Sequence, residues 1–177
     1  DHVGALAGAP VDVASLVELY RAAPDRFTIA ALGHAGRQAL EELLQWSDVH
    51  DLSRQLNADA YEVGIATGST RVVISALDGL IGVERRCGRW DAALRLAAEY
   101  DAYVTGQNPE LAGTPHADTV WLLAATGDLT VVRASVPLVV DDVTGVVAVG
   151  RYSVLADMGF ALLVLGDIEP AAELLQA

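Results

Sequence analysis

Three glycines recur at a fixed interval, and this spacing constrains the fold of the chain more than any other feature. Gly88, Gly127 and Gly166 follow one another at a constant spacing of 39 positions, and each is followed by a bulky side chain two positions later and then by a helical pattern. A glycine between two helical segments is typical of the turn in a helix–turn–helix unit. Upstream of Gly88 Ser47 takes the place of the glycine, and Gly8 lies one further interval back. The spacing therefore predicts about four and a half helix pairs.

The composition agrees with an all-helical solenoid. Ala, Leu, Arg and Glu are abundant, only 6 of the 177 residues are Pro, and 53% are hydrophobic. Stacked helix pairs bury such apolar residues between neighbouring repeats. The predicted fold class is all-α, a superhelix with a period near 39 positions, in a single helical-repeat domain over residues 1–177. The chain starts without Met and stops within a helical run, so we expect an excised part of a longer protein.

The repeat register gives the expected helices. They lie at 11–22, 26–46, 48–57, 68–86, 89–104, 115–126, 128–136, 146–165 and 167–177. The segment Gly64–Thr70 is expected to be a glycine-containing loop. Residues 136–149 locally favour a hairpin, because VPLVVDDVTGVVAV is rich in β-branched side chains and contains Pro137. Packing against neighbouring helices overrides local propensity, so the repeat favours helix in this segment as well.

Charge and residue usage exclude several functions. All eleven basic residues are Arg, so the chain lacks the lysine of a phosphate-binding loop and of Schiff-base chemistry. The net charge of −13 repels phosphate backbones, and we expect no direct contact with nucleic acid. No uninterrupted apolar run reaches the length that a membrane-spanning helix needs, so we expect no membrane span. Cys87 is the only cysteine, which argues against disulfides and favours the cytoplasm.

The sequence shows no pattern of an enzyme or a metal centre. The four histidines lack the i, i+4 spacing of a metal site, and the adjacent carboxylates Glu41–Glu42 and Asp141–Asp142 do not converge on a helix. No Gly-x-Ser-x-Gly motif, Cys/His nucleophile pair or glycine-rich dinucleotide loop occurs. We therefore expect no catalytic residues, no metal and no cofactor.

The repeat turns resemble those of tetratricopeptide-like repeats, in which the second helix follows Gly-x-aromatic-x-x-Ala. The segment GRWDAA at 88–93 matches this pattern, and GDIEPA at 166–171 matches it with Ile168 in place of the aromatic residue. Gly159 falls on the small-residue position of the family's first helix. The phrases RRCGRWDAALRLAAEY and ADMGFALLVLGDIEPAAELL further resemble the helical sensor region of large ATP-dependent LuxR-type transcription regulators. In that family an ATPase module precedes the superhelix and a helix-turn-helix domain follows it, so the resemblance implies only a sensing or protein-contact role here.

The tetratricopeptide register implies a concave groove lined by one face of each first helix. The candidate groove residues are Arg37, Glu41, Asp78, Arg85, Arg86, Trp121 and Phe160. Aromatic stacking and arginine side chains suit a protein segment of a partner or a small-molecule effector. A simpler interpretation of Arg85 and Arg86 is a favourable interaction with the helix C-terminus. Trp46 and Trp90 lie beside turns, and we interpret them as packing residues.

These observations predict a non-enzymatic, signal-sensing or protein-interaction superhelix of a bacterial LuxR-type regulator. The alternative is a general tetratricopeptide scaffold for protein–protein interaction that is not linked to transcription, and self-association stays open. The same register predicts that Arg37, Asp78, Arg85 and Trp121 are partly exposed. It further predicts close helix crossings at Ala93 and Ala171, and burial of the apolar stripe residues Leu80, Leu94, Leu155 and Leu174.

Overall fold

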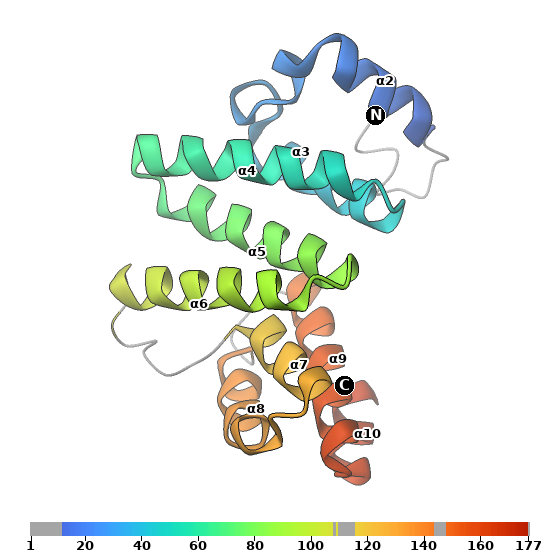
Figure 1. The fold of residues 1–177 in the computed structure, drawn as a ribbon, viewed down its shortest axis with the longest axis vertical. Coiled ribbons are helices and arrows are strands. Elements are labelled where there is room, and N and C mark those ends of the chain that lie inside the picture. Colours follow the sequence, from blue (N-terminus) through green and yellow to red (C-terminus); the bar gives the residue numbers. More distant parts are fainter. Residues whose placement is uncertain (1–11, 108, 110–115, 144–147, 177) are drawn as a thin grey trace. The chain divides into compact units, whose positions relative to one another are not determined.

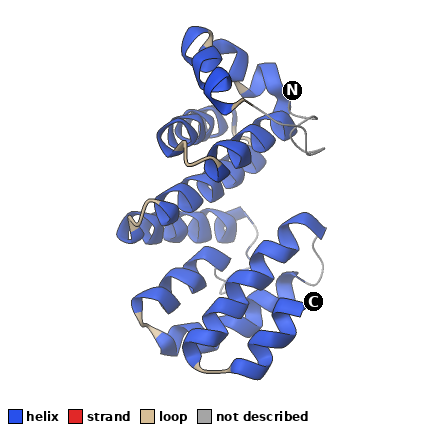
Figure 2. Ribbon diagram, turned by 90° about the vertical axis from the view of Figure 1, so that its right-hand side faces the viewer, coloured by secondary structure: helices blue, strands red, loops and turns tan. Residues whose placement is uncertain are grey.

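The computed structural model describes residues 12–107, 109, 116–143 and 148–176, and every regular element among them is helical (Figures 1 and 2). The elements are α2 (Val13–Ala22), the 3₁₀ helix η1 (Pro24–Phe27), α3 (Ile29–Trp46), α4 (His50–Thr67), α5 (Thr70–Arg86), α6 (Trp90–Gln107), α7 (Ala117–Thr126), α8 (Leu129–Val143), α9 (Ala148–Leu165) and α10 (Ile168–Gln176). The predicted all-α class is thus confirmed for these residues. None of these helices combines the length and the hydropathy needed to span a bilayer.

The chain divides into two compact units, residues 1–88 and residues 89–177. Within unit 1, α3 packs on α4, α4 packs on α5, and α3 also contacts α5. Within unit 2, the helices from α6 to α10 pack in sequence order, and α7 also contacts α9 (Figure 1). Contacts between neighbours and next neighbours agree with stacked helix pairs. The single continuous domain and the superhelix over 1–177 stay predictions.

A left-handed glycine forms each of the three turns predicted at 88, 127 and 166, whereas Gly8 lies outside the described residues. Gly88, Gly127 and Gly166 have φ angles of 70°, 95° and 84°, a region that favours glycine because it has no Cβ. In each case the next helix begins two residues later. After Gly127, the backbone N–H of Asp128 donates to the carbonyl of Leu123 at 3.0 Å, which is the hydrogen bond of a Schellman cap. The constant glycine interval therefore maps onto a left-handed residue two positions before the next helix in all three turns.

In the first hairpin the left-handed residue is Asp48 and not Ser47. Ser47 caps α3 with a φ of −99°, and Asp48 follows with a φ of 57°. Cys87 and Gly88 have the same relation at the end of α5. The expected alignment at Ser47 is therefore wrong by one residue, because aspartate tolerates the left-handed region better than most residues do. With Asp48 as the turn residue, the repeat predicts that different side chains of α3 face the interior.

Three helices run further than the sequence predicts, α6 by three residues and α4 and α8 by more. Helix α4 continues to Thr67 where an end near residue 57 was expected, because the first left-handed residue that stops it is Gly68, with a φ of 65°. The loop expected at Gly64–Thr70 is wrong in its first half, which is helical. Helix α8 continues to Val143 with Pro137 inside it. The helix that the repeat predicts is confirmed at 136 and 148–149, residues 137–143 are helical where neither helix was expected to reach, and 144–147 lie outside the described residues.

Each unit has its own apolar core. The core of unit 1 contains Tyr20, Phe27, Leu40, Leu44 and Leu56, and that of unit 2 contains Ala117, Val120, Ala124, Val132, Val136, Val139, Met158 and Ala161. The packing expected at Ala93 and Ala171 is supported, since both are fully buried at 0% exposure.

The leucines of the apolar stripes are buried to different degrees. Leu155 is buried, as expected. Leu80, Leu94 and Leu174 are only half-buried, so full burial of these three is wrong. Leu174 packs against the unit 2 core from α10, which places it at the edge of that core and not within it.

Candidate functional site

Arg37 and Glu41 lie in the interior of unit 1. Arg37 has 2% and Glu41 4% of its surface exposed, so the expected partial exposure of Arg37 is wrong and neither side chain presents itself to a ligand in a groove. The shifted register explains the error. Counted back from the left-handed Asp48, Arg37 takes the position that Leu77 and Leu155 hold relative to their own turn glycines, and those leucines are buried too.

The buried guanidinium is bound mainly by α4. Arg37 donates to the backbone carbonyl of Leu56 at 3.1 Å and to Oδ1 of Asn57 at 3.3 and 3.4 Å, and Oε2 of Glu41 lies 3.5 Å from its Nη2. Burial lowers the pKa of Arg37, and the charge of Glu41 opposes this shift; an arginine nevertheless stays protonated. Asn57 in turn donates to the carbonyl of Ser53 at 3.0 Å. We interpret this network as structural.

Gly79 on α5 makes room for the network. A Cβ at this position would overlap Oε1 of Glu41 and would lie 2.6 Å from Oδ1 of Asn57. Because no side chain stands there, α5 can approach the polar groups that α3 and α4 place between the helices. Arg37 and Glu41 therefore belong to the contact between three helices.

The candidates on α5 lie nearer the surface. Asp78 and Arg86 are exposed and Arg85 is half-buried, so the exposure expected for Asp78 and Arg85 is confirmed. Arg86 donates to Oε1 of Gln45 on α3, and Nε2 of Gln45 lies 3.5 Å from Oε1 of Glu41. Arg86 therefore ties the C-terminal end of α5 to the buried network.

Arg54, which the sequence did not single out, forms two short ion pairs in unit 1. Its Nε donates to Glu84 on α5 at 2.7 Å, and its Nη1 donates to Asp51 on α4 at 2.8 Å. The pair of Arg54 with Asp51 has the i, i+3 spacing of a helix surface pair. That spacing was a readable signal, whereas the partner Glu84 lies on the next helix and only the packing of α4 on α5 reveals it.

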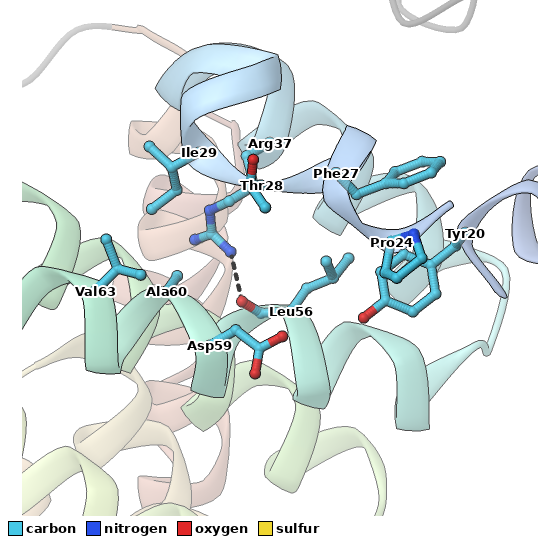
Figure 3. A pocket seen from close by; sticks show the side chains of 10 residues that line it. All are labelled: Tyr20, Pro24, Phe27, Thr28, Ile29, Arg37, Leu56, Asp59, Ala60 and Val63. Atoms are coloured by element: carbon cyan, nitrogen blue, oxygen red, sulfur yellow. Dashed lines mark hydrogen bonds between the residues drawn. The ribbon is translucent and has the colours of Figure 1, made fainter. Parts of the chain in front are cut away.

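A small pocket opens in unit 1 between η1, α3 and α4 (Figure 3). Its volume is about 70 Å³. It is lined by Tyr20, Pro24, Phe27, Thr28, Ile29, Arg37, Leu56, Asp59, Ala60 and Val63. Burial and the charge of Asp59 raise the pKa of Tyr20 beside it. A closed apolar cavity of about 150 Å³ binds one benzene, so this pocket is on the scale of a few waters or one side chain.

Trp121 and Phe160, two predicted groove residues, lie against each other in unit 2. Their ring centroids are 5.1 Å apart with an interplanar angle of 23°, which is a stacked pair. Trp90 meets Trp121 edge-on, with centroids 6.3 Å apart and an angle of 84°. We call Trp90, Trp121 and Phe160 the aromatic cluster. Trp90 is 38% exposed and the other two rings are half-buried, so the partial exposure expected for Trp121 is confirmed.

Trp90 is the member of this cluster that the sequence missed as a candidate. Its position after a repeat turn predicts a packing role. It does pack on Trp121, yet more than a third of its surface stays exposed. Its place at the start of α6 could have indicated this exposure, because the first residue of a helix has no preceding turn of the same helix beside it.

A polar contact links the start of α7 to α6 within unit 2. Oδ1 of Asp101 accepts the backbone N–H of His116 at 2.9 Å, and the rings of Tyr100 and His116 are 4.3 Å apart. Nδ1 of His116 accepts the backbone N–H of Asp118 at 3.3 Å and so caps α7. Burial raises the pKa of Asp101, while the hydrogen bond from His116 and its charge oppose this shift. These residues position α7 and therefore Trp121.

The structure thus pairs the predicted residues by unit, Arg37 with Glu41 in unit 1 and Trp121 with Phe160 in unit 2. Comparison with protein-family models, with curated proteins and with solved structures gives no match. The described residues form about ten helices and no other regular element, and no family is identified.

Proposed function

We propose that this chain is a helical-hairpin binding module that senses an effector or receives a partner protein, and that it acts as the sensor region of a LuxR-type transcription regulator. Its paired helices with left-handed turn residues at 88, 127 and 166 support the first part. The link to transcription rests on the resemblance of the segments at 85–100 and 156–175 to LuxR-type sensor regions. The alternative is a general tetratricopeptide scaffold for protein–protein interaction.

The aromatic cluster is the observation that carries the proposal. Tryptophan and tyrosine dominate the binding energy of many interfaces, because a large ring removes much apolar surface from water at little entropic cost. The cluster places two indoles and a phenyl ring together and leaves Trp90 38% exposed. A partly exposed group of three large rings on packed helices is where specific binding is most easily built.

The proposal assigns no catalysis to this chain. The polar side chains of Arg37, Glu41 and Asn57 in unit 1 are buried, and Arg37 is bound to the other two. The chain carries a net charge of −13, so the proposal includes no direct contact with nucleic acid. We place the module in the cytoplasm because Cys87 is the only cysteine. We expect neither a metal nor a cofactor.

A titration followed through the indole N–H resonances tests the binding role. The ¹⁵N-labelled chain has three indoles, and substitution of each Trp by Phe assigns them. We expect a ligand or partner segment to shift the resonances of Trp90 and Trp121 in a saturable manner. If candidate effectors and partner segments bind elsewhere and leave both resonances unchanged, the aromatic cluster is not the site and the proposal fails.

Reading the coding sequence on either side of this segment separates the two forms of the proposal. A regulator requires an upstream nucleotide-binding loop and a downstream helix-turn-helix. A scaffold lacks one or both. The binding test above does not depend on this outcome.

A further inference from the structure

We infer that the outer face of the helix pair α9 and α10 receives the first helix of a further helix pair of the same repeat type. We call this surface the stacking face. It is formed by Ala156 and Leu163 on α9 and by Leu175 on α10. The inference goes beyond the binding role proposed above and needs no ligand at the aromatic cluster.

The preceding helix pair of unit 2 shows the same three positions in a covered state. One interval of 39 residues upstream they are Ala117 and Ala124 on α7 and Val136 on α8. These side chains are 9%, 2% and 5% exposed, and all three belong to the core of unit 2. The repeat therefore places a buried contact at these positions.

The stacking face of α9 and α10 is open. Leu163 is 48% and Leu175 53% exposed, and Ala156 is exposed as well. One side of Leu175 already lies against α9, because a Cβ at Gly159 would be 2.8 Å from Cγ of this leucine. The open part of the side chain is therefore additional to its contact within the pair.

The difference between the two pairs is largest on the outer face. On the inner face, Val132 of α8 and its counterpart Ala171 of α10 are both 0% exposed, and so are Leu122 of α7 and its counterpart Ala161 of α9. The two pairs thus share their internal packing. They differ where a following pair lies on the first of them.

Helix α9 shows what covers such a face. Its residues Met158 and Ala161 join the same core as the three covered positions, and α9 contacts both α7 and α8. Leu163 is five residues after Met158, so it lies roughly 140° further around the helix. One side of α9 therefore covers the preceding pair and the other side carries the stacking face. A further first helix would lie on α9 and α10 as α9 lies on α7 and α8.

The established contact also gives the chemistry of the occupant. Helix α9 meets the preceding pair through Met158 and Ala161, with Leu165 packed beside them. Their i, i+3, i+7 spacing forms one apolar helix stripe that contains a small residue. The last repeat of a stack in water has a polar outer face, whereas this face carries two exposed leucines. A second copy of the chain suits the face less well, because each copy carries a net charge of −13.

A chain extended by one helix pair tests the inference. Residues 139–177 are repeated once after Ala177, which adds one interval of 39 residues and keeps the spacing of the turn glycines. Hydrogen exchange followed by mass spectrometry compares α10 in the extended and the unextended protein. We expect the backbone amides of α10 to exchange about tenfold more slowly in the extended protein, because a covered helix opens less often.

Two matched substitutions make this test specific. Leu163→Glu, made in the original copy only, places a charge in the stacking face and should abolish the slower exchange of α10. Leu138→Glu is the control, because Leu138 on α8 is 47% exposed against 48% for Leu163 and lies outside the contact that α9 makes with the core. It should leave the slower exchange in place. Far-ultraviolet circular dichroism of the unextended variants checks that both keep their helices.

Each other outcome overturns the inference in a recognisable way. If the extension does not slow the exchange of α10, the stacking face does not receive a pair of this type. If the slower exchange persists in Leu163→Glu, it arises only because α10 is no longer at the chain end. If the unextended chain sediments as a dimer that Leu163→Glu dissociates, the occupant is a second copy. The indole titration of Trp90 and Trp121 is independent of these results, so either proposal can fail without the other.

Discussion

The indole of Trp121 stacks on the ring of Phe160, with the ring centroids 5.1 Å apart and an angle of 23° between the planes. The two residues are 39 positions apart in the sequence, which is one repeat interval. Each lies six residues before its turn glycine, Gly127 or Gly166. The stack therefore joins equivalent positions of successive helix pairs, α7 and α9.

A double-mutant cycle measures this stack. We expect the coupling free energy between Trp121→Ala and Phe160→Ala to be about 0.5–1.5 kcal/mol, since stacked aromatic pairs contribute this much beyond the area they bury. Urea denaturation of the two single variants and the double variant gives the value. Additive effects would mean that the rings pack independently.

The buried ion pair of Arg37 and Glu41 predicts that removing one partner destabilises the chain more than removing both. Glu41→Ala alone should cost about 3–5 kcal/mol, because it leaves the charge of Arg37 buried without its carboxylate. Adding Arg37→Leu should recover much of this loss, since leucine is the residue found at the equivalent positions 77 and 155. Denaturant unfolding of the single and the double variant shows which of them is more stable. A double variant that is less stable than Glu41→Ala would contradict the register drawn from Asp48.

Gly79 should tolerate no side chain. Gly79→Ala is expected to destabilise the chain by about 1–3 kcal/mol through overpacking, because its Cβ would overlap Glu41 and crowd Asn57. The control is Gly106→Ala, where a Cβ meets no atom within 4 Å and a helical alanine stabilises by about 0.5–1 kcal/mol relative to glycine. We expect Gly79→Ala to lower the free energy of unfolding and Gly106→Ala to raise it. A neutral Gly79→Ala would show that α5 is not held this closely.

Asp101 predicts part of the pH dependence of stability. Its folded-state pKa is raised above the ordinary value of 3.8 by burial, so the folded chain holds this proton to higher pH than the unfolded chain does. The contribution of Asp101 to stability is therefore fully present below pH 3.8 and is lost as the pH rises through the folded pKa. Asp101→Asn keeps an acceptor for the backbone N–H of His116 but cannot ionise.

Urea titrations of both proteins at several pH values measure this effect. Relative to the unaltered chain, Asp101→Asn should gain stability as the pH rises from about 4 towards neutrality. A stability difference that does not change with pH would show that burial does not raise the pKa of Asp101.

The sequence predicts the helical class and three of the turns because both depend on local signals. Glycine at 88, 127 and 166 marks a left-handed turn directly. Asp48 does the same without a glycine, and the resulting one-residue shift placed Arg37 and Glu41 on the wrong face of α3. A shift of one residue rotates a helix face by about 100°, which turned two interior residues into groove candidates.

The partners of the buried polar groups could not be predicted from the sequence. Asn57 meets Arg37, and Gly79 lies against Glu41 and Asn57, only because α3, α4 and α5 pack on one another. The stack of Trp121 on Phe160 could have been predicted, because both residues hold the same position relative to their turn glycines. The contact of Trp90 with Trp121 depends on how α6 packs on α7, and no local pattern encodes that packing.

The substitution Trp121→Ala tests most directly whether the aromatic cluster is a binding surface. Affinity for the ligand that shifts the indole resonance of Trp90 and the thermal melting temperature are measured on the same protein. We expect the affinity to fall by about 1–3 kcal/mol, with the helical content nearly unchanged and only a modest fall in melting temperature. If the variant melts much earlier while its affinity is intact, Trp121 is a core residue and the aromatic cluster is not the binding surface.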